Sequence, residues 1–186
     1  QDAVFLSNHA QGRSASYFMN EEDRKMAASI YLLMPGKSYV YYGEEIGLLG
    51  SGVDENKRLP MQWGSKEAEH IPNRFANADY KEFEISNVDE QMKDSDSLWN
   101  HYKKIIRLRT KYPELSSMDV KVSTDDEASL LIFDYKDIKV MHNLSREEKT
   151  ISFDGEILDS VYGNYKYKNN QLDISAFETI IYKTGG

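Results

Sequence analysis

The pattern of the chain changes at Pro113, and this change constrains the fold more than any other feature of the sequence. Before Pro113, apolar runs alternate with segments whose apolar residues recur every three or four positions, which is the order of strands and helices in a βα repeat. After Leu115, short runs of β-branched and aromatic residues are separated by turn-forming residues, as in a small antiparallel β-sandwich. The sequence therefore predicts two domains, an α/β domain at residues 1–113 and an antiparallel β-domain at residues 114–186.

The first domain opens with an apolar run that leads into the polar stretch from Ser7 to Arg13. A loop that follows a buried strand often carries functional residues. The elements predicted here are a strand at 3–6, a helix at 20–34, a strand at 39–42 and a helix at 98–111.

The second domain is predicted to contain only short strands. They are expected at 120–122, 130–135, 138–142, 150–153, around Ile174 and at 179–182. Tyr162, Tyr165 and Tyr167 are open to two interpretations: they form a surface platform for sugars, or they finish a strand and its turn.

Composition excludes several classes of function. The net charge is −8, from 23 Lys and Arg against 31 Asp and Glu, so binding to a nucleic-acid backbone has no electrostatic support. No apolar run reaches the roughly 20 residues of a membrane span, and residues 1–3 do not resemble the start of a signal peptide. We therefore expect a mature or internal segment with no nucleic-acid or membrane partner. The absence of cysteine excludes disulfides, thiolate nucleophiles and cysteine-bound zinc.

The polar stretch carries a resemblance to a known family. Residues 5–10, Phe-Leu-Ser-Asn-His-Ala, resemble the fourth signature segment of the α-amylase family of glycoside hydrolases, which usually reads Phe-Leu-x-Asn-His-Asp. Similar segments follow in the family's order: MPGKSYVYYGEEIGLLG at 34–50, DENKRLPMQW at 54–63, NVDEQMKDSDSLWNHYKKIIRLR at 87–109 and YPEL at 112–115.

The resemblance implies a (β/α)8 TIM barrel, of which residues 1–113 are the C-terminal quarter with strands seven and eight, followed by the family's C-terminal β-domain at 114–186. It places catalysis at the C-terminal ends of the barrel strands. The family's nucleophile and acid lie on strands four and five, and the chain contains no Gly-x-Arg-x-Asp segment. The chain is thus expected to be a C-terminal fragment or one piece of a nicked chain, with the upstream half of the barrel as its partner.

Ala10 occupies the position of the family's third carboxylate, the Asp that stabilises the transition state. Its loss is expected to lower turnover more than sugar affinity. Two hypotheses remain open: a deliberate replacement that traps a sugar complex, or a naturally inactive relative that has discarded the acid.

The resemblance also implies which residues bind substrate. His9 matches the histidine that hydrogen-bonds the sugar at the cleavage site. Asp54 and Arg58 match a pair that reaches sugars on the non-reducing side, although they can also form an ion pair that holds their loop. Arg13 is open between a sugar contact and a salt bridge.

Other polar residues are expected to be structural. Asn8 is expected to support its loop by bonding neighbouring backbone groups. Glu44 and Glu45 are rejected as a catalytic pair, because adjacent residues at a strand end point in different directions.

The sequence does not indicate a metal site. His70, His101 and His142 share no ligand spacing. No cofactor is expected in this segment. Where the family binds calcium, the site lies mostly upstream; residues 54–56 offer oxygen atoms but are more simply a solvated acidic loop.

The function expected of the parent protein from the resemblance is retaining hydrolysis of α-1,4 linkages in starch or malto-oligosaccharides. This segment, a fragment or an inactivated variant that lacks one catalytic carboxylate, is expected to be inactive. An α-1,6-acting oligo-glucosidase or a transglycosylase of the same family is the nearest alternative. A catalytically silent sugar-binding or scaffold relative is the alternative from another class. An extracellular or cell-surface bacterial location is favoured over a cytoplasmic one.

Overall fold

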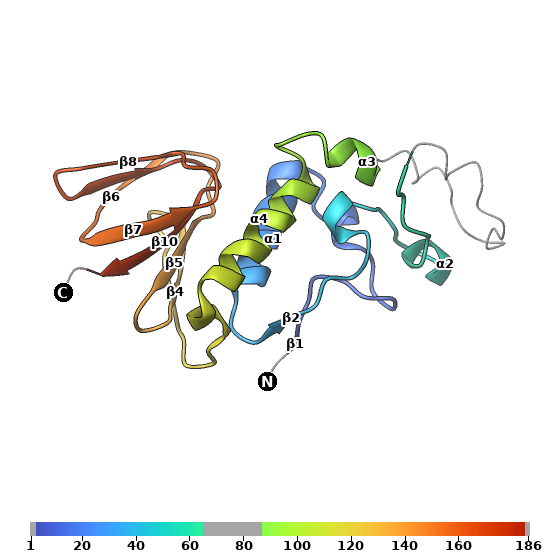
Figure 1. The fold of residues 1–186 in the computed structure, drawn as a ribbon, viewed down its shortest axis with the longest axis horizontal. Helices are drawn as coiled ribbons and strands as arrows, with labels where there is room; N and C mark the ends of the chain where they lie inside the picture. The colour runs from blue at the N-terminus through green and yellow to red at the C-terminus, as the bar shows by residue number, and fades with distance from the viewer. Residues whose placement is uncertain (1–2, 65–86, 185–186) are drawn as a thin grey trace. The chain divides into compact units, whose positions relative to one another are not determined.

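The computed structural model describes residues 3–64 and 87–184 (Figure 1). The chain divides into two compact units. The described residues of one unit are 3–31, 38–64 and 87–106, and those of the other are 32–37 and 107–184. Two helices contribute residues to both units, and the domain boundary expected at residue 113 stays a prediction.

The described residues up to residue 116 form short strands, helices and 3-10 turns. These elements are β1 (Ala3–Val4), η1 (Ser14–Ser16), α1 (Glu21–Leu33), β2 (Lys37–Ser38), η2 (Glu44–Ile46), α2 (Asp54–Lys57), α3 (Val88–Gln91), α4 (Leu98–Lys111) and η5 (Pro113–Ser116). Within this set β1 and β2 form a two-stranded sheet.

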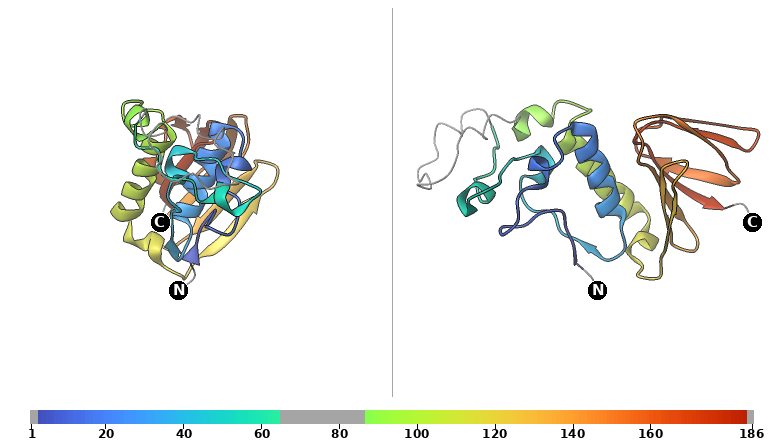
Figure 2. Two further views of the ribbon diagram at one scale, coloured as in Figure 1. Left: turned by 90° about the vertical axis from the view of Figure 1, so that its right-hand side faces the viewer. Right: turned by 180° about the vertical axis from the view of Figure 1, so that it is seen from behind.

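The two long predicted helices are confirmed as α1 and α4, which lie side by side (Figures 1 and 2). The Oγ of Ser97 accepts the N–H of Asn100 at 3.2 Å and so caps α4. The rings of Tyr31 and Tyr102 approach to 6.4 Å between centroids, and His101 Nε2 lies 2.8 Å from the carbonyl oxygen of Lys25. Packing of their apolar faces against each other stabilises both helices.

The predicted strand at 39–42 is wrong. The structure places β2 at Lys37–Ser38, and β1 ends at Val4 rather than at residue 6. The N–H of Tyr39 still donates to the carbonyl of Val4 at 2.8 Å, but β1 ends at Val4 and, among the described residues, gives residues 40–42 no strand to pair with. Because a strand needs a neighbour to bond its backbone, the apolar run from residue 40 leaves the sheet.

The described residues 121–184 form two antiparallel sheets. The strands are β3 (Lys121–Asp125), β4 (Leu130–Asp134), β5 (Lys139–Asn143), β6 (Lys149–Ser152), β7 (Gly155–Ser160), β8 (Tyr165–Lys168), β9 (Gln171–Ile174) and β10 (Thr179–Thr184). The five-stranded sheet has the order β3-β4-β5-β10-β7 and the three-stranded sheet the order β6-β9-β8. Strand β7 was not predicted, because Gly155 at its start is a turn signal in sequence; it pairs with β10 across a register shift at Ile181/Tyr182.

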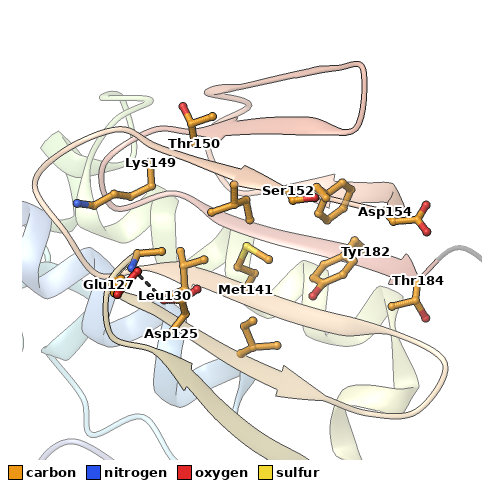
Figure 3. A pocket seen from close by; sticks show the side chains of 14 residues that line it. Asp125, Glu127, Leu130, Met141, Lys149, Thr150, Ser152, Asp154, Tyr182 and Thr184 are labelled. Carbon is orange, nitrogen blue, oxygen red and sulfur yellow. Dashed lines mark hydrogen bonds between the residues drawn. The ribbon is translucent and has the colours of Figure 1, made fainter.

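Side chains from both sheets share one hydrophobic core. Leu130, Met141 and Ile180 of the larger sheet cluster with Leu172 and Ile174 of the smaller one. Beside this cluster a cavity of about 640 Å³ opens between β6 and the face of β4, β5 and β10. Figure 3 shows Lys149, Thr150 and Ser152 of β6 on one side, and Leu130, Met141 and Tyr182 of the larger sheet on the other.

Two buried histidines predict how stability depends on pH. Burial lowers the pKa of His101 to about 4 and that of His142 to about 3. Below about pH 6.5 the unfolded chain takes up protons that the folded chain does not, so the free energy of unfolding falls by about 1.4 kcal/mol per pH unit for each histidine. We expect urea titrations at successive pH values to show a steady loss of stability from pH 6.5 to about 4.

The replacement His101→Gln is expected to reduce this slope, because it removes one of the two groups. Equal slopes for the original chain and for this variant would contradict the assignment to His101.

Candidate functional site

The loop after β1 is shaped by its own polar side chains. The Oδ1 of Asn8 accepts the N–H groups of Ala10 at 2.8 Å and of Gln11 at 3.0 Å, so the predicted supporting role of Asn8 is confirmed. His9 and Ala10 are exposed at the tip of this turn, and Ser7 is buried at its base. The loop therefore presents the predicted histidine and the alanine to solvent.

Glu44 anchors the base of the loop from below. Its buried carboxylate accepts hydrogen bonds from the hydroxyls of Ser7 and Tyr31. Burial raises the pKa of both Glu44 and its neighbour Glu45. Glu44 thus acts as a buried acceptor that ties elements of the structure together, which fits the rejection of a catalytic pair.

Arg13 is fully buried, at 0% exposure. Its guanidinium carbon lies 4.6 Å from the ring centroid of Tyr41 and 4.7 Å from that of Tyr42, and Nη1 donates to the Tyr42 carbonyl at 2.6 Å. Burial lowers the pKa of Arg13. Within the described residues this side chain packs against two adjacent aromatic rings, and its predicted sugar contact stays a prediction.

Asp54 and Arg58 form the ion pair that the sequence left open. Arg58 Nη2 lies 3.1 Å from Asp54 Oδ2, and the two side chains are 43% and 60% exposed, respectively. A hydrogen bond from Lys57 and the charge of Arg58 lower the pKa of Asp54, which is therefore ionised at neutral pH. Both groups can still face a ligand, and their predicted sugar contact stays a prediction.

Lys57 joins the two predicted parts of the site. Its Nζ lies 3.1 Å from Asp54 Oδ1 and 3.3 Å from the carbonyl oxygen of Ala10. The three-residue spacing from Asp54 was visible in the sequence, since such pairs meet on a helix. The contact with Ala10, 47 residues away, had no sequence signal.

The described residues contain no group of three or more His, Asp or Glu side chains that could hold a metal ion. His101 Nε2 lies 2.8 Å from the Lys25 carbonyl oxygen of α1, and Nδ1 of His142 lies 2.9 Å from Oγ1 of Thr179. His70 lies outside the described residues. In the same part of the chain, no helix combines the length and the apolarity of a membrane span.

Comparison with known proteins decides the family. The family model described as "Alpha amylase, catalytic domain" matches residues 1–118. The chain belongs to the α-amylase family. Alpha-amylase 3 of Dictyoglomus thermophilum is 36% identical over 191 residues, which cover 98% of this chain and 38% of that protein.

Two further members of the α-amylase family show the same partial coverage. Probable oligo-1,6-glucosidase 2 of Bacillus subtilis is 27% identical over 79% of this chain and 35% of its own length. The structure of Eubacterium rectale Amy13B matches with a TM-score of 0.82 and 29% identity, covering 100% of this chain and 39% of that one. The chain thus spans less than half the length of these α-amylase family relatives, which are larger barrel proteins.

Proposed function

We propose that these residues belong to a retaining glycoside hydrolase that acts on α-1,4 linkages of starch or malto-oligosaccharides. In this proposal residues 1–113 are the C-terminal quarter of the barrel and residues 114–186 are a β-sandwich. The upstream half, in the same polypeptide or a nicked chain, supplies the nucleophile and the acid. The 36% identity to a protein named Alpha-amylase 3 supports the α-1,4 assignment.

One observation carries the proposal: the His9–Ala10 loop and the Asp54–Arg58 pair are held together through Lys57. An imidazole, a carboxylate and a guanidinium on neighbouring exposed segments can bond several sugar hydroxyls at once. His9 would bond the sugar at the cleavage site, and Asp54 with Arg58 would bond a sugar further along the chain.

Binding of maltoheptaose tests the proposal. The test uses the complete polypeptide, meaning these residues together with the proposed upstream half. We expect measurable binding by calorimetry, and about tenfold weaker binding for Asp54→Asn because a charge-assisted hydrogen bond is lost. The matched control is Asp126→Asn, an exposed aspartate of the β-domain that should leave the affinity unchanged. Absence of maltoheptaose binding would overturn the proposal.

An α-1,6-acting enzyme is the second candidate. The 27% identity to a protein named Probable oligo-1,6-glucosidase 2 favours it, as does the RLPMQW segment at residues 58–63. Stronger binding of isomalto-oligosaccharides than of malto-oligosaccharides of equal length would select this candidate.

A further inference from the structure

We propose that Lys57 is a positioning residue that fixes the His9–Ala10 loop relative to the Asp54–Arg58 pair and thereby sets the affinity for α-glucans. This inference rests on the function proposed above. It names a residue that contacts no sugar itself in that proposal and acts through the groups it holds.

The Lys57 ammonium contacts both the His9–Ala10 loop and the Asp54 carboxylate. It contacts the carbonyl oxygen of Ala10 at 3.3 Å and Asp54 Oδ1 at 3.1 Å, while its side chain is only 13% exposed. An ammonium has three donors, so it can bond both oxygens at once. Removing it would free the loop and the carboxylate from each other.

The Asp54 carboxylate pairs with two cations, Lys57 and Arg58. Lys57 takes Oδ1, whereas Arg58 takes Oδ2. Two cations on different oxygens fix the plane of the carboxylate, and one cation alone leaves it free to turn. The Asp54 carboxylate is 60% exposed, so solvent weakens its ion pair with Lys57 and the pair contributes little to stability. The effect of Lys57 is therefore expected in ligand affinity rather than in folding.

The backbone on either side of the Lys57 side chain is itself fixed by hydrogen bonds from two tyrosines. The Tyr41 hydroxyl donates to the Lys57 carbonyl at 3.0 Å, and the Tyr42 hydroxyl donates to the Leu59 carbonyl at 2.9 Å. The rings of these two tyrosines contact each other and both pack against the buried Arg13 guanidinium. The segment that carries Lys57 is thus held by two hydrogen bonds from tyrosines whose rings pack against a buried cation.

The backbone around Gly50 also links the segment that carries Lys57 to Arg13. The Gly50 carbonyl accepts the N–H of Arg13 at 2.8 Å, and Asn56 Nδ2 donates to the Ser51 carbonyl at 3.0 Å. A Cβ on Gly50 would clash with the Asn56 carbonyl oxygen, so only glycine permits this approach. The loop that carries Ala10 and the segment that carries Asp54, both of which Lys57 contacts, are therefore joined through one connected set of contacts.

The test compares Lys57→Met, which keeps an unbranched side chain without the charge, with Lys57→Arg, which keeps the charge. In the complete polypeptide we expect maltoheptaose affinity to fall about tenfold for Lys57→Met and to stay within about twofold for Lys57→Arg. Lys168→Met, at an exposed lysine of β8, is the matched control and should bind as the original protein does.

A second readout separates positioning from a general structural effect. NMR titration of labelled aspartate should show the pKa of Asp54 rising in Lys57→Met and staying low in Lys57→Arg, with unchanged thermal unfolding in both. Unchanged maltoheptaose affinity in Lys57→Met overturns the inference and leaves the proposed function intact. Absence of maltoheptaose binding in every variant, the original included, overturns the proposed function and the inference with it.

Discussion

Replacing Ala10 by Asp in the complete polypeptide is expected to raise kcat for malto-oligosaccharide hydrolysis by about 10²- to 10⁴-fold, with a much smaller change in KM. In the proposed function this carboxylate bonds the distorted sugar, and such bonds contribute several kcal/mol in the transition state. Because they strengthen there, turnover should change more than affinity. The exposed loop tip accepts the larger side chain without disturbing the core.

Release of reducing sugar from maltotriose and isomaltotriose measures this effect and also reports the linkage that is cleaved. Ala10→Asn is the matched control, because it has nearly the shape of Asp but no charge, and it should stay close to the activity of the original protein. If Ala10→Asp stays inactive while maltoheptaose still binds, the silent sugar-binding relative is the better description.

Replacing Glu178 by Ala is expected to lower the free energy of unfolding of the β-domain by about 4 kcal/mol. Glu178 is fully buried, at 0% exposure, directly before β10. Its carboxylate accepts the backbone N–H groups of Val161, Tyr162, Asn164 and Thr179 at 2.8–3.2 Å. Alanine would remove these charge-assisted bonds, and leaving buried donors without an acceptor is costly.

Urea titration followed by tyrosine fluorescence and circular dichroism would measure this loss. Glu178→Gln should lower the free energy of unfolding by less, about 2 kcal/mol, because one oxygen remains as an acceptor. A loss persists because the new amide group is a donor that faces backbone donors. Glu147→Ala, at an exposed glutamate of the same domain, should change stability by less than about 0.5 kcal/mol. A loss below 1 kcal/mol for Glu178→Ala would show that water replaces the carboxylate.

Elements that carry their own signals were predicted, whereas elements that depend on a partner were not. Helices α1 and α4 have periodic apolar faces, and Pro35 and Pro113 mark where each pattern stops, so the sequence was sufficient for them. The run at 39–42 has strand composition, but the two-residue strand β1 gives it no neighbour. Strand β7 is the opposite case: its sequence did not predict a strand, but pairing with β10 overrides the turn signal of Gly155.

The candidate site divides in the same way. The role of Asn8 follows from local chemistry, since a short amide bonds the backbone two and three residues ahead. The packing of buried Arg13 against two tyrosines and the bridge from Lys57 to Ala10 join residues that are 28, 29 and 47 positions apart. No spacing rule in a single sequence reports contacts of that range.

The order of the strands has a consequence for how copies of this chain meet at high concentration. The outermost strands of the described sheets are β3 and β7 in one sheet and β6 and β8 in the other. Unpaired backbone at such positions is a template for aggregation, which proteins suppress with charged side chains. Each of these strands carries at least one: Lys121, Glu156, Lys149 and Lys166, respectively. Parallel, in-register pairing between identical edge strands would bring like charges together, so we expect the β-domain to resist this route to fibrils.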